Sequence, residues 1–447
     1  MESESHFSRR IILSHYLLTS LMHVHILLGL QWGDEGKGKI VDFLAPRFQV
    51  VARFQGGPNA GHTLEFDGQK HVLHQIPSGI FRPEIKNIIG NGLVIDPVVF
   101  QHEIESLDKY NLNVKDNLYI SKKAHLILPT HKLLDAAYES LKGDKKIGST
   151  LRGIGPAYQS KVAREGLRIG DILSPNFETK YQELLESHKR ILEYLEYPYE
   201  IGEAEALFFD SLAFIHEMHV TDTEYLINDC LKNGDSILAE GAQGSLLDVD
   251  FGSYPYVTSS STISAGACTG LGIAPNKIGE IFGICKAYAT RVGSGPFPTE
   301  QDNEIGEKLR QIGREFGATT GRKRRCGWLD LPALHYTCMI NGTTQLLLMK
   351  FDVLNTFAEI PVCTHYELPD GSITDRVPHC LVDTPVKPIY KIMKGWQQDL
   401  SHVRKFEDMP VELRTYIDFI EEKTQIPVSL ASIGPDRTQT VVRGALA

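Results

Sequence analysis

The sequence predicts an α/β fold in which a large, mostly parallel central sheet is flanked by helices. Short runs of consecutive apolar residues recur along the chain, and each ends in a glycine-rich or polar turn. Such unalternating runs are typical of strands that are buried on both faces of a parallel sheet. Amphipathic stretches with helical spacing lie between the runs, and strands that alternate with helices indicate an α/β protein. Ligands of such proteins bind at the loops that follow the carboxyl ends of the strands.

Six apolar runs are the predicted strands. In chain order they are residues 25–30, 50–54, 87–89, 237–239, 346–349 and 428–431. The clearest helices are expected over Glu178–Tyr197 and Glu412–Lys423, where leucine, isoleucine and tyrosine recur at helical spacing. The largely helical stretch from about 174 to 234 is a candidate subdomain. We expect residues 1–24 to be an N-terminal tail and residues 25–447 to form one domain with helical and loop subdomains.

The composition narrows the class of protein. The chain has 447 residues, of which 42% are hydrophobic and 23% are charged, as in soluble globular proteins. The 46 basic and 56 acidic residues give a formal net charge of −10, which argues against a general nucleic-acid-binding surface. Seven cysteines are scattered without a C-x-x-C pair, which disfavours a disulfide framework or a structural zinc site. Reduced thiols in the cytoplasm are the simpler expectation.

The N-terminal tail contains most of a long stretch without charged residues. No Asp, Glu, Lys or Arg occurs from Ile11 to Gly33, and two arginines precede this stretch, as in a signal peptide. Histidines at 15, 23 and 25 interrupt the stretch, and no small-residue cleavage site follows. Its last residues are also needed for the first strand, so we expect no membrane segment. Two explanations stay open: a disordered or weakly helical tail, or translation that begins at Met22.

A glycine-rich loop follows the first predicted strand. Gly33–Lys39 fits the phosphate-binding pattern G-x-x-x-x-G-K, but Ile40 stands where a P-loop has Ser or Thr. Glycines let backbone N–H groups converge on phosphate oxygens, and lysines add positive charge. Without the hydroxyl, Mg²⁺ needs another ligand, and the carboxylate of Asp34 is the candidate. The alternative is a surface hairpin with solvated charges.

A possible guanine-binding element ends the fifth predicted strand. Met349-Lys350-Phe351-Asp352 resembles the N-K-x-D element of GTP-binding proteins, with Met in place of Asn. A carboxylate accepts hydrogen bonds from both N1–H and the 2-amino group of guanine, which adenine does not offer. The alternative is a plain Lys–Asp pair at a strand end. Together with the phosphate loop, the element favours GTP.

Five motifs in order are more specific than either element alone. They are Trp32–Lys39, Gly56–Thr63, Gly153–Tyr158, Glu240–Gly244 and Gly317–Arg322. With them the chain resembles the adenylosuccinate synthetase family, from about His25 to the C-terminus. Pro58 and Ile433 stand where the family commonly has His and Thr.

The resemblance implies a function and a set of partners. It implies a Mg²⁺-dependent ligase of purine biosynthesis that joins IMP and L-aspartate, with GTP, into adenylosuccinate, GDP and phosphate. The reaction passes through 6-phosphoryl-IMP and is the first committed step of AMP synthesis from IMP. The resemblance also implies a cytoplasmic homodimer without nucleic-acid or membrane partners.

The resemblance assigns the chemistry residue by residue. Asp34 is expected to be the base that removes the N1 proton of IMP, and His62 is expected to be its partner acid at O6. Asp34 and the backbone oxygen of Gly61 are the expected Mg²⁺ ligands. Arg164 is expected to reach the IMP site of the partner subunit, with Lys161 supporting the same region; a surface salt bridge is the alternative for both.

The resemblance also implies which residues bind each of the three substrates. The expected GTP set is Gly33, Asp34, Glu35, Gly36, Lys37, Gly38, Lys39, Gly61, His62, Thr63, Arg324, Lys350, Phe351, Asp352, Ser432, Ile433 and Gly434. The expected IMP set is Asp34, Glu35, Gly36, Lys37, Asn59, Ala60, Gly61, His62, Thr150, Arg164, Gln243, Thr258 and Arg322. The expected aspartate set is Ala318, Thr319, Thr320, Gly321, Arg322, Lys323 and Arg324, a basic run whose alternative is a nucleic-acid or localisation patch.

Two other functions stay open at this point. One is a regulatory GTP-binding switch, which hydrolyses GTP slowly without a second substrate. The other is a GTP-dependent kinase that acts on a different small metabolite.

Overall fold

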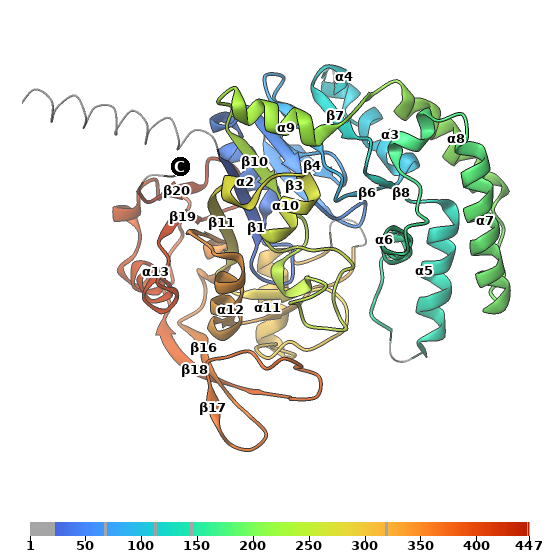
Figure 1. Cartoon of the computed structure of the whole chain (residues 1–447). Helices are drawn as coiled ribbons and strands as arrows, with labels where there is room; N and C mark the ends of the chain where they lie inside the picture. The colour runs from blue at the N-terminus through green and yellow to red at the C-terminus, as the bar shows by residue number, and fades with distance from the viewer. Residues whose placement is uncertain are drawn as a thin grey trace, which may run out of the picture.

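The computed structural model describes residues 23–66, 69–110, 112, 114–143, 146–317, 321–444 and 446 (Figure 1). The predicted tail falls outside these residues except for its last two positions. No helix in the described ranges is long and apolar enough to span a bilayer.

A 10-stranded sheet forms the centre of the molecule. Its strands, from one edge to the other, are β20 (Thr440–Val442), β19 (Val428–Ser432), β15 (Gln345–Met349), β11 (Ile278–Lys286), β1 (Val24–Gly29), β10 (Ile237–Glu240), β2 (Val50–Arg53), β5 (Lys86–Ile89), β7 (Leu118–Ser121) and β9 (His219–Thr221). Every neighbouring pair is parallel except β19 and β20. The predicted fold class is therefore confirmed.

All six predicted strands are present in this sheet, within one or two residues of the expected bounds. Their unalternating apolar character follows from burial on both faces. In β1, Leu27 packs into one apolar cluster with Ile40 and Leu44, whereas Ile26 and Leu28 pack into the cluster on the other face. Successive side chains of a strand point to opposite faces of the sheet. Because both faces of β1 pack against apolar clusters, apolar residues follow one another in its sequence.

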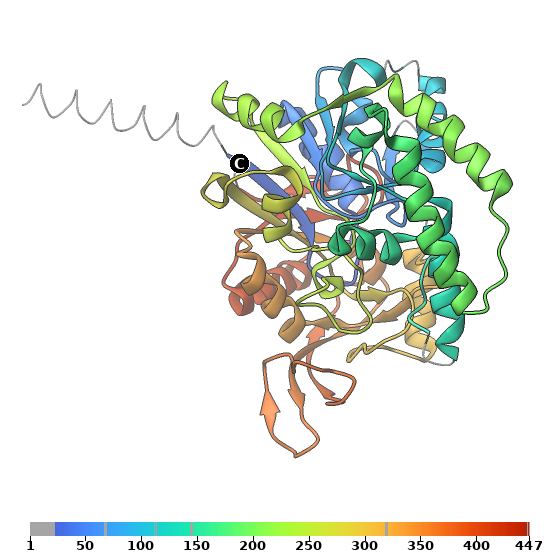
Figure 2. The same cartoon turned by 45° about the vertical axis from the view of Figure 1, so that its right-hand side comes forward.

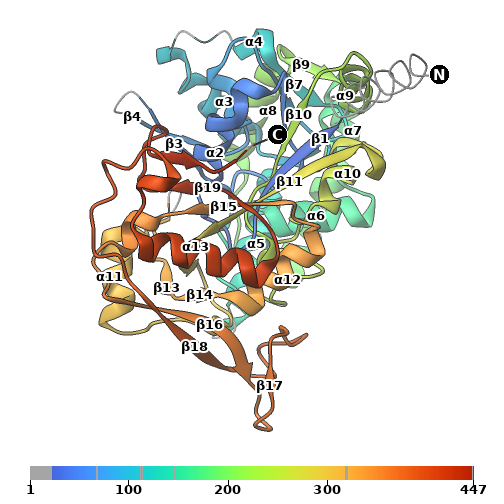
Figure 3. The same ribbon diagram turned by 90° about the vertical axis from the view of Figure 1, so that its left-hand side faces the viewer.

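Helices cover both faces of the sheet. On one face, α2 (Lys37–Leu44) follows β1 directly and packs against it. On the other, α12 (Leu331–Asn341) and α13 (Val411–Thr424) pack against the strands, and Figure 3 shows α13 alongside β15 and β19. The prediction of a helix over Glu412–Lys423 is confirmed.

The other helices lie around the sheet. They are α3 (Pro97–Glu105), α4 (Val114–Asn117), α5 (Pro129–Leu141), α6 (Ile154–Ala163), α7 (Phe177–Tyr194), α8 (Gly202–His216), α9 (Thr223–Lys232), α10 (Ala265–Leu271) and α11 (Glu304–Gly313). Helices α7 and α8 form the outermost layer on the β7–β9 side (Figures 1 and 2). Helix α7 confirms the helix predicted over Glu178–Tyr197, but ends three residues earlier. The stretch from 174 to 234 is not purely helical, because it also supplies the edge strand β9.

Short strand pairs complete the fold. These are β3 (His62–Phe66) with β4 (Gln69–Leu73), β6 (Val94–Ile95) with β8 (His125–Leu126), and β12 (Ala289–Arg291) with β13 (Arg325–Gly327). A further sheet contains β14 (Leu329–Asp330), β16 (Glu359–Glu367), β17 (Ile373–Thr374) and β18 (Lys387–Lys394). The β16–β18 part of it projects from the body of the molecule (Figure 1).

Candidate functional site

A pocket of about 880 Å³ is lined by the loops that follow β1, β10, β15 and β19. These strands lie in the middle of the parallel sheet, where β19 is next to β15, β1 is next to β10, and β11 lies between the two pairs. The loops beyond the carboxyl ends of such strands are where α/β proteins bind their ligands. Asp34, His62 and Asp352, the residues expected to carry the chemistry, all line this one pocket.

Most of the other expected binding residues line the same pocket. They are Gly33, Glu35, Gly36, Lys37, Gly38, Lys39, Asn59, Ala60, Gly61, Thr63, Thr150, Gln243, Thr258, Arg322, Arg324, Lys350, Ser432 and Gly434. The pocket also has lining residues that the sequence did not single out, among them Tyr138 and Glu139 of α5 and Lys142, which directly follows this helix. No local motif marks these three, because only the packing of α5 brings them here.

The glycine-rich loop is folded around the buried carboxylate of Glu35. This carboxylate accepts hydrogen bonds from the backbone N–H groups of Gln31 (3.1 Å) and Gly33 (2.8 Å). It also pairs with the Nζ atom of Lys37 at 2.5 Å, and the same ammonium donates to the backbone oxygen of Gln243. The loop turns tightly, with Gly33, Asp34 and Gly36 all at positive φ. Glu35 therefore shapes the loop from within, while the side chain of Asp34 faces the pocket.

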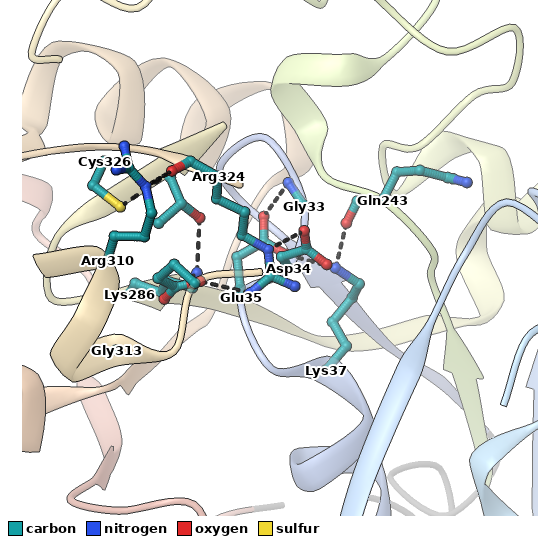
Figure 4. A network of polar contacts seen from close by, with 12 residues as sticks. Gly33, Asp34, Glu35, Lys37, Gln243, Lys286, Arg310, Gly313, Arg324 and Cys326 are labelled. Atoms are coloured by element: carbon teal, nitrogen blue, oxygen red, sulfur yellow. Dashed lines mark hydrogen bonds and ion pairs between the residues drawn. The ribbon is translucent and has the colours of Figure 1, made fainter. Parts of the chain in front are cut away.

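Asp34 is held by an arginine from the opposite wall (Figure 4). The Nε atom of Arg324 lies 2.8 Å from Oδ2 of Asp34, and its Nη1 atom donates to Glu315 at 2.6 Å. Glu315 is fully buried and also accepts a hydrogen bond from Lys286 at 2.9 Å. Burial alone would raise the pKa of Glu315, but the charges of Lys286, Lys350 and Arg324 lower it to about 2. Glu315 is thus a fixed negative charge that anchors Arg324.

His62 begins β3 and is only 4% exposed. Its Nδ1 atom contacts the carboxylate of Glu240, and its Nε2 atom has no hydrogen-bond partner among the described residues. Burial, followed by the charge of Arg53, lowers the pKa of His62 to about 4.

The far end of the pocket has the features expected for a guanine site. Asp352 lies just after β15, and its buried Oδ1 atom has no hydrogen-bond partner within the described ranges. Burial raises the pKa of this carboxyl group. Lys39 of the glycine-rich loop donates to Oγ of Ser432 and to the backbone oxygen of Gly434, both at 2.7 Å. The phosphate loop and the 432–434 loop are therefore tied together.

The wall expected to bind IMP contains a preformed amide pair. The Nε2 atom of Gln243 donates to Oδ1 of Asn59 at 3.2 Å, and the buried Oε1 atom of Gln243 has no partner in the described part of the chain. Glu139 accepts from the backbone N–H groups of Gly148 (2.6 Å) and Ser149 (3.1 Å), next to Thr150. The side-chain amide of Gln243 is therefore available to hydrogen-bond a purine edge. The backbone next to Thr150 is fixed by its hydrogen bonds to Glu139.

Some expected residues lie away from the pocket lining. Phe351 and Ile433 bury their side chains in the main apolar cluster, so only their backbone can serve a nucleotide. Lys323 is exposed outside the lining set, and Arg164 is exposed at the C-terminal end of α6. Gly321 is exposed too, and the expected aspartate-binding residues Ala318, Thr319 and Thr320 lie outside the described residues.

The described residues contain no cluster of three or more His, Cys, Asp or Glu side chains that could hold a metal ion. Mg²⁺ is commonly held by one or two carboxylates together with substrate phosphates. A carboxylate and a backbone oxygen, as in Asp34 and Gly61, are hard oxygen donors of the kind that suits this ion. The donor set therefore fits Mg²⁺ that arrives with a nucleotide.

Comparison with known proteins identifies relatives over nearly the whole chain. Residues 26–441 match the family model described as adenylosuccinate synthetase. The adenylosuccinate synthetase of Cytophaga hutchinsonii is 60% identical over 424 residues, which is 94% of this chain and 98% of the relative. That of Flavobacterium johnsoniae is 56% identical and covers 94% of this chain and 100% of the relative.

Two solved structures are also similar to this chain. The fully ligated adenylosuccinate synthetase from Plasmodium falciparum superimposes with a TM-score of 0.89 at 37% identity, covering 94% of this chain and 100% of that one. A succinoaminodeoxyadenylate synthetase of cyanophage S-2L has a TM-score of 0.61 at 22% identity, over 94% of this chain and 95% of its own, and shows the shared fold.

Proposed function

The chain belongs to the adenylosuccinate synthetase family, and we propose that it is a GTP-dependent ligase of purine biosynthesis that joins IMP to L-aspartate. The products are adenylosuccinate, GDP and phosphate. The observation that carries the proposal is the convergence of Asp34, His62 and Asp352 on one pocket.

The reaction has two displacement steps. The 6-oxo group of IMP is a poor leaving group, so it must first become a phosphate ester. We assign Asp34 the removal of the N1 proton, which shifts charge to O6 for attack on the γ-phosphorus of GTP. GDP leaves, and 6-phosphoryl-IMP remains. The amino group of aspartate then attacks C6, and phosphate departs with the C6–O bond electrons. This is the first committed step of AMP synthesis from IMP.

We assign His62 a role at O6 of IMP, the oxygen that is phosphorylated in the first step and leaves with phosphate in the second. Its unpartnered Nε2 atom is the ring nitrogen available to a ligand, because Nδ1 is engaged by Glu240. From this position it stabilises charge at O6 and at the transferred phosphoryl group, and assists the departure of phosphate.

Asp34 and the backbone oxygen of Gly61 would hold Mg²⁺, which neutralises charge on the GTP phosphates when it is bound. The present partner of Asp34 is Arg324, at 2.8 Å. Binding of GTP offers Arg324 phosphate oxygens in exchange for this carboxylate. The side chain of Asp34 is 29% exposed and so is accessible to new partners.

Asp352 is assigned to the guanine base and the 318–324 run to aspartate. A buried acceptor without a partner suits the N1–H and 2-amino donors of guanine. Arg322 and Arg324 supply guanidinium groups suited to carboxylates and phosphates. Closure of this run over the pocket would exclude water from the phosphoryl intermediate.

We further propose a homodimer in which Arg164 serves the IMP site of the partner subunit. The exposed position of Arg164 outside its own pocket supports this proposal. A cytoplasmic location and a single catalytic domain over residues 25–447 are also proposed.

The test is an assay that follows the purine ultraviolet spectrum as the 6-oxo group becomes a substituted amine. The expected result is a change that requires IMP, GTP and aspartate together with Mg²⁺. A spectral change with GTP and IMP alone would favour the kinase. Slow GTP hydrolysis that is indifferent to IMP and aspartate would favour the switch, and either result would overturn the proposal.

A further inference from the structure

We infer that Arg291 is a positioning residue for the reaction, whose guanidinium joins three segments of the pocket wall into the arrangement that receives IMP. The three segments are Trp32 at the start of the glycine-rich loop, residues 253–258 and residues 294–296. The inference deepens the proposed function and rests on it in one respect, because it takes Thr258 and the wall around it to bind IMP. None of the binding sets that the resemblance implies contains Arg291.

Arg291 ends β12, lines the pocket and is only 1% exposed. Its guanidinium donates to four acceptors on two loops. On the loop that follows β12, Nε donates to the backbone oxygen of Ser294 at 3.0 Å and Nη1 donates to that of Pro296 at 2.9 Å. On the loop that precedes α10, Nη1 donates to Oγ of Ser253 at 2.9 Å and Nη2 donates to the backbone oxygen of Tyr256 at 3.0 Å. One side chain therefore ties the two loops together.

The loop that precedes α10 carries Thr258 into the pocket. The buried carboxylate of Asp248 holds the two ends of this loop. It accepts hydrogen bonds of 2.6 to 3.2 Å from four backbone N–H groups, those of Asp250, Phe251, Thr262 and Ile263. Between these ends, Arg291 fixes the backbone two residues before Thr258. The position of Thr258 in the pocket thus depends on Arg291 as well as on Asp248.

The third segment is the start of the glycine-rich loop, where Trp32 opens the first of the five motifs. The guanidinium of Arg291 lies over the Trp32 ring, 5.5 Å from its centroid, in a cation–π contact. The Nε1 atom of Trp32 donates to the same Ser253 hydroxyl at 3.3 Å. The glycine-rich loop is assigned to the phosphates of GTP and Thr258 to IMP. Arg291 therefore sets the position of one substrate's site relative to that of the other.

The shape of the guanidinium suits this task. All four of its acceptors are uncharged, and the nearby carboxylate of Glu300 is paired with Nε of Arg325 at 2.7 Å. A planar fork with five N–H donors can reach four separated acceptors, whereas a lysine ammonium has its donors on one atom. Gly295 leaves room for the fork, because a Cβ atom at this position would lie 2.4 Å from Nη2 of Arg291.

Arg291→Lys separates shape from charge, because lysine keeps the positive charge and loses the fork. We expect the affinity for IMP and kcat each to fall about 10-fold, since misplaced reacting groups slow a transfer reaction. The KM of GTP should change less than about threefold, because Glu35 shapes the phosphate loop independently. General damage to the fold would not produce this difference between the two substrates.

Calorimetric titration with IMP measures the affinity without turnover, and steady-state rates give kcat and each KM. Arg291→Lys that binds IMP as tightly as the wild type would overturn the inference. So would a KM of GTP that rises as much as the KM of IMP. Absence of IMP binding by the wild type would instead overturn the proposed function, and the inference with it.

Ser253→Ala is a milder second variant, which removes only the hydroxyl that accepts from Trp32 and Arg291. It should raise the KM of IMP about threefold, and this loss should not add to that of Arg291→Lys, because both changes break the same junction. If Arg291→Lys does not fold, Ser253→Ala decides by itself, and a KM of IMP equal to that of the wild type would contradict the inference. Fully additive losses would contradict it as well.

Arg404→Lys is the matched control. The Nη1 atom of Arg404 also donates to two backbone oxygens, those of Ser401 at 2.6 Å and Val403 at 2.8 Å, but the side chain is exposed and lies outside the pocket lining. This variant should keep the wild-type kcat and the wild-type KM of IMP. A loss equal to that of Arg291→Lys would show that the effect does not come from the junction at the pocket, and would overturn the inference.

Discussion

The Nε atom of Arg324 lies 2.8 Å from Oδ2 of Asp34, so the two side chains that we assign to GTP and to proton transfer neutralise each other across the pocket. Glu315 holds the other end of the same guanidinium at 2.6 Å. Arg324 therefore has a fixed anchor and an exchangeable partner. We expect substrates that supply phosphate oxygens to replace Asp34 as the partner of Arg324 and so to free this carboxylate for proton transfer.

Asp34→Asn should lower kcat by at least about 100-fold, since an amide cannot accept the N1 proton. Asparagine tolerates the positive φ of this position, 60°, so the fold should survive. Steady-state rates and a thermal unfolding curve check both points. Asp370→Asn, in an exposed turn of the projecting hairpin, is the control that should keep full activity. A fully active Asp34→Asn variant would remove Asp34 as the base.

Asp352→Asn should weaken GTP binding about 10- to 100-fold, because one buried acceptor becomes a donor that faces guanine. The KM of IMP should hardly change. ITP, which lacks the 2-amino group, provides the sharper comparison. The wild type should prefer GTP over ITP, and the variant should lose most of this preference. Titration calorimetry with each nucleotide measures it, and an unchanged GTP affinity would refute base recognition by Asp352.

Arg164→Leu should raise the KM of IMP and leave the KM of GTP nearly unchanged. If each site uses Arg164 from the other subunit, mixing this variant with Asp34→Asn restores one intact site in every hybrid dimer. Random mixing in equal amounts, assayed at an IMP concentration well below the KM of the Arg164→Leu variant, should then yield about one quarter of the wild-type rate. Activity of the mixture no higher than the sum of the separate variants would contradict a shared site.

The protein should lose stability between pH 6.5 and about 4, in part through His188 of α7. Burial lowers the pKa of His188 to about 4 from the usual 6.5, so its stabilising contribution is complete above pH 6.5. That contribution is lost as the pH falls through 4 and amounts to about 3 kcal/mol. His131 lies against it at a ring distance of 4.8 Å, and burial shifts its pKa in the same direction.

Denaturant unfolding at pH 7 and pH 4.5 checks this expectation. His188→Gln removes the titrating ring and should lessen the pH dependence, whereas His216→Gln, at an exposed position of α8, should not. The same pH dependence in wild type and His188→Gln would show that the source lies elsewhere.

Much of the fold was predictable from local sequence, for a physical reason. A strand buried on both faces is apolar at most of its positions, so β1, β2 and β10 are recognisable from their own residues, although Arg53 ends β2 and Glu240 ends β10. Strand β9 was missed because it is a three-residue, partly exposed edge strand and carries no such signal. Strand β11 was missed because Glu280 and two glycines interrupt its apolar run.

The pocket was predictable where its residues are contiguous. The loops around Asp34, His62 and Asp352 each carry a local pattern, and all three line one pocket. Pairings between distant parts of the chain were not predictable. Glu240 and His62 are 178 positions apart, and Asp34 and Arg324 likewise come from opposite ends of the sequence and meet across the pocket. The roles that we assign to these residues stay predictions until the variants are measured.

The bridge from Lys39 to Ser432 spans 393 positions of the chain. On the ribosome, the phosphate loop with Lys39 is synthesised long before its partner Ser432. Strand β1 likewise waits for β10 and β11, its two neighbours in the sheet. The wall of the nucleotide pocket that Ser432 and Gly434 form can consequently be completed only after both of these residues have been synthesised.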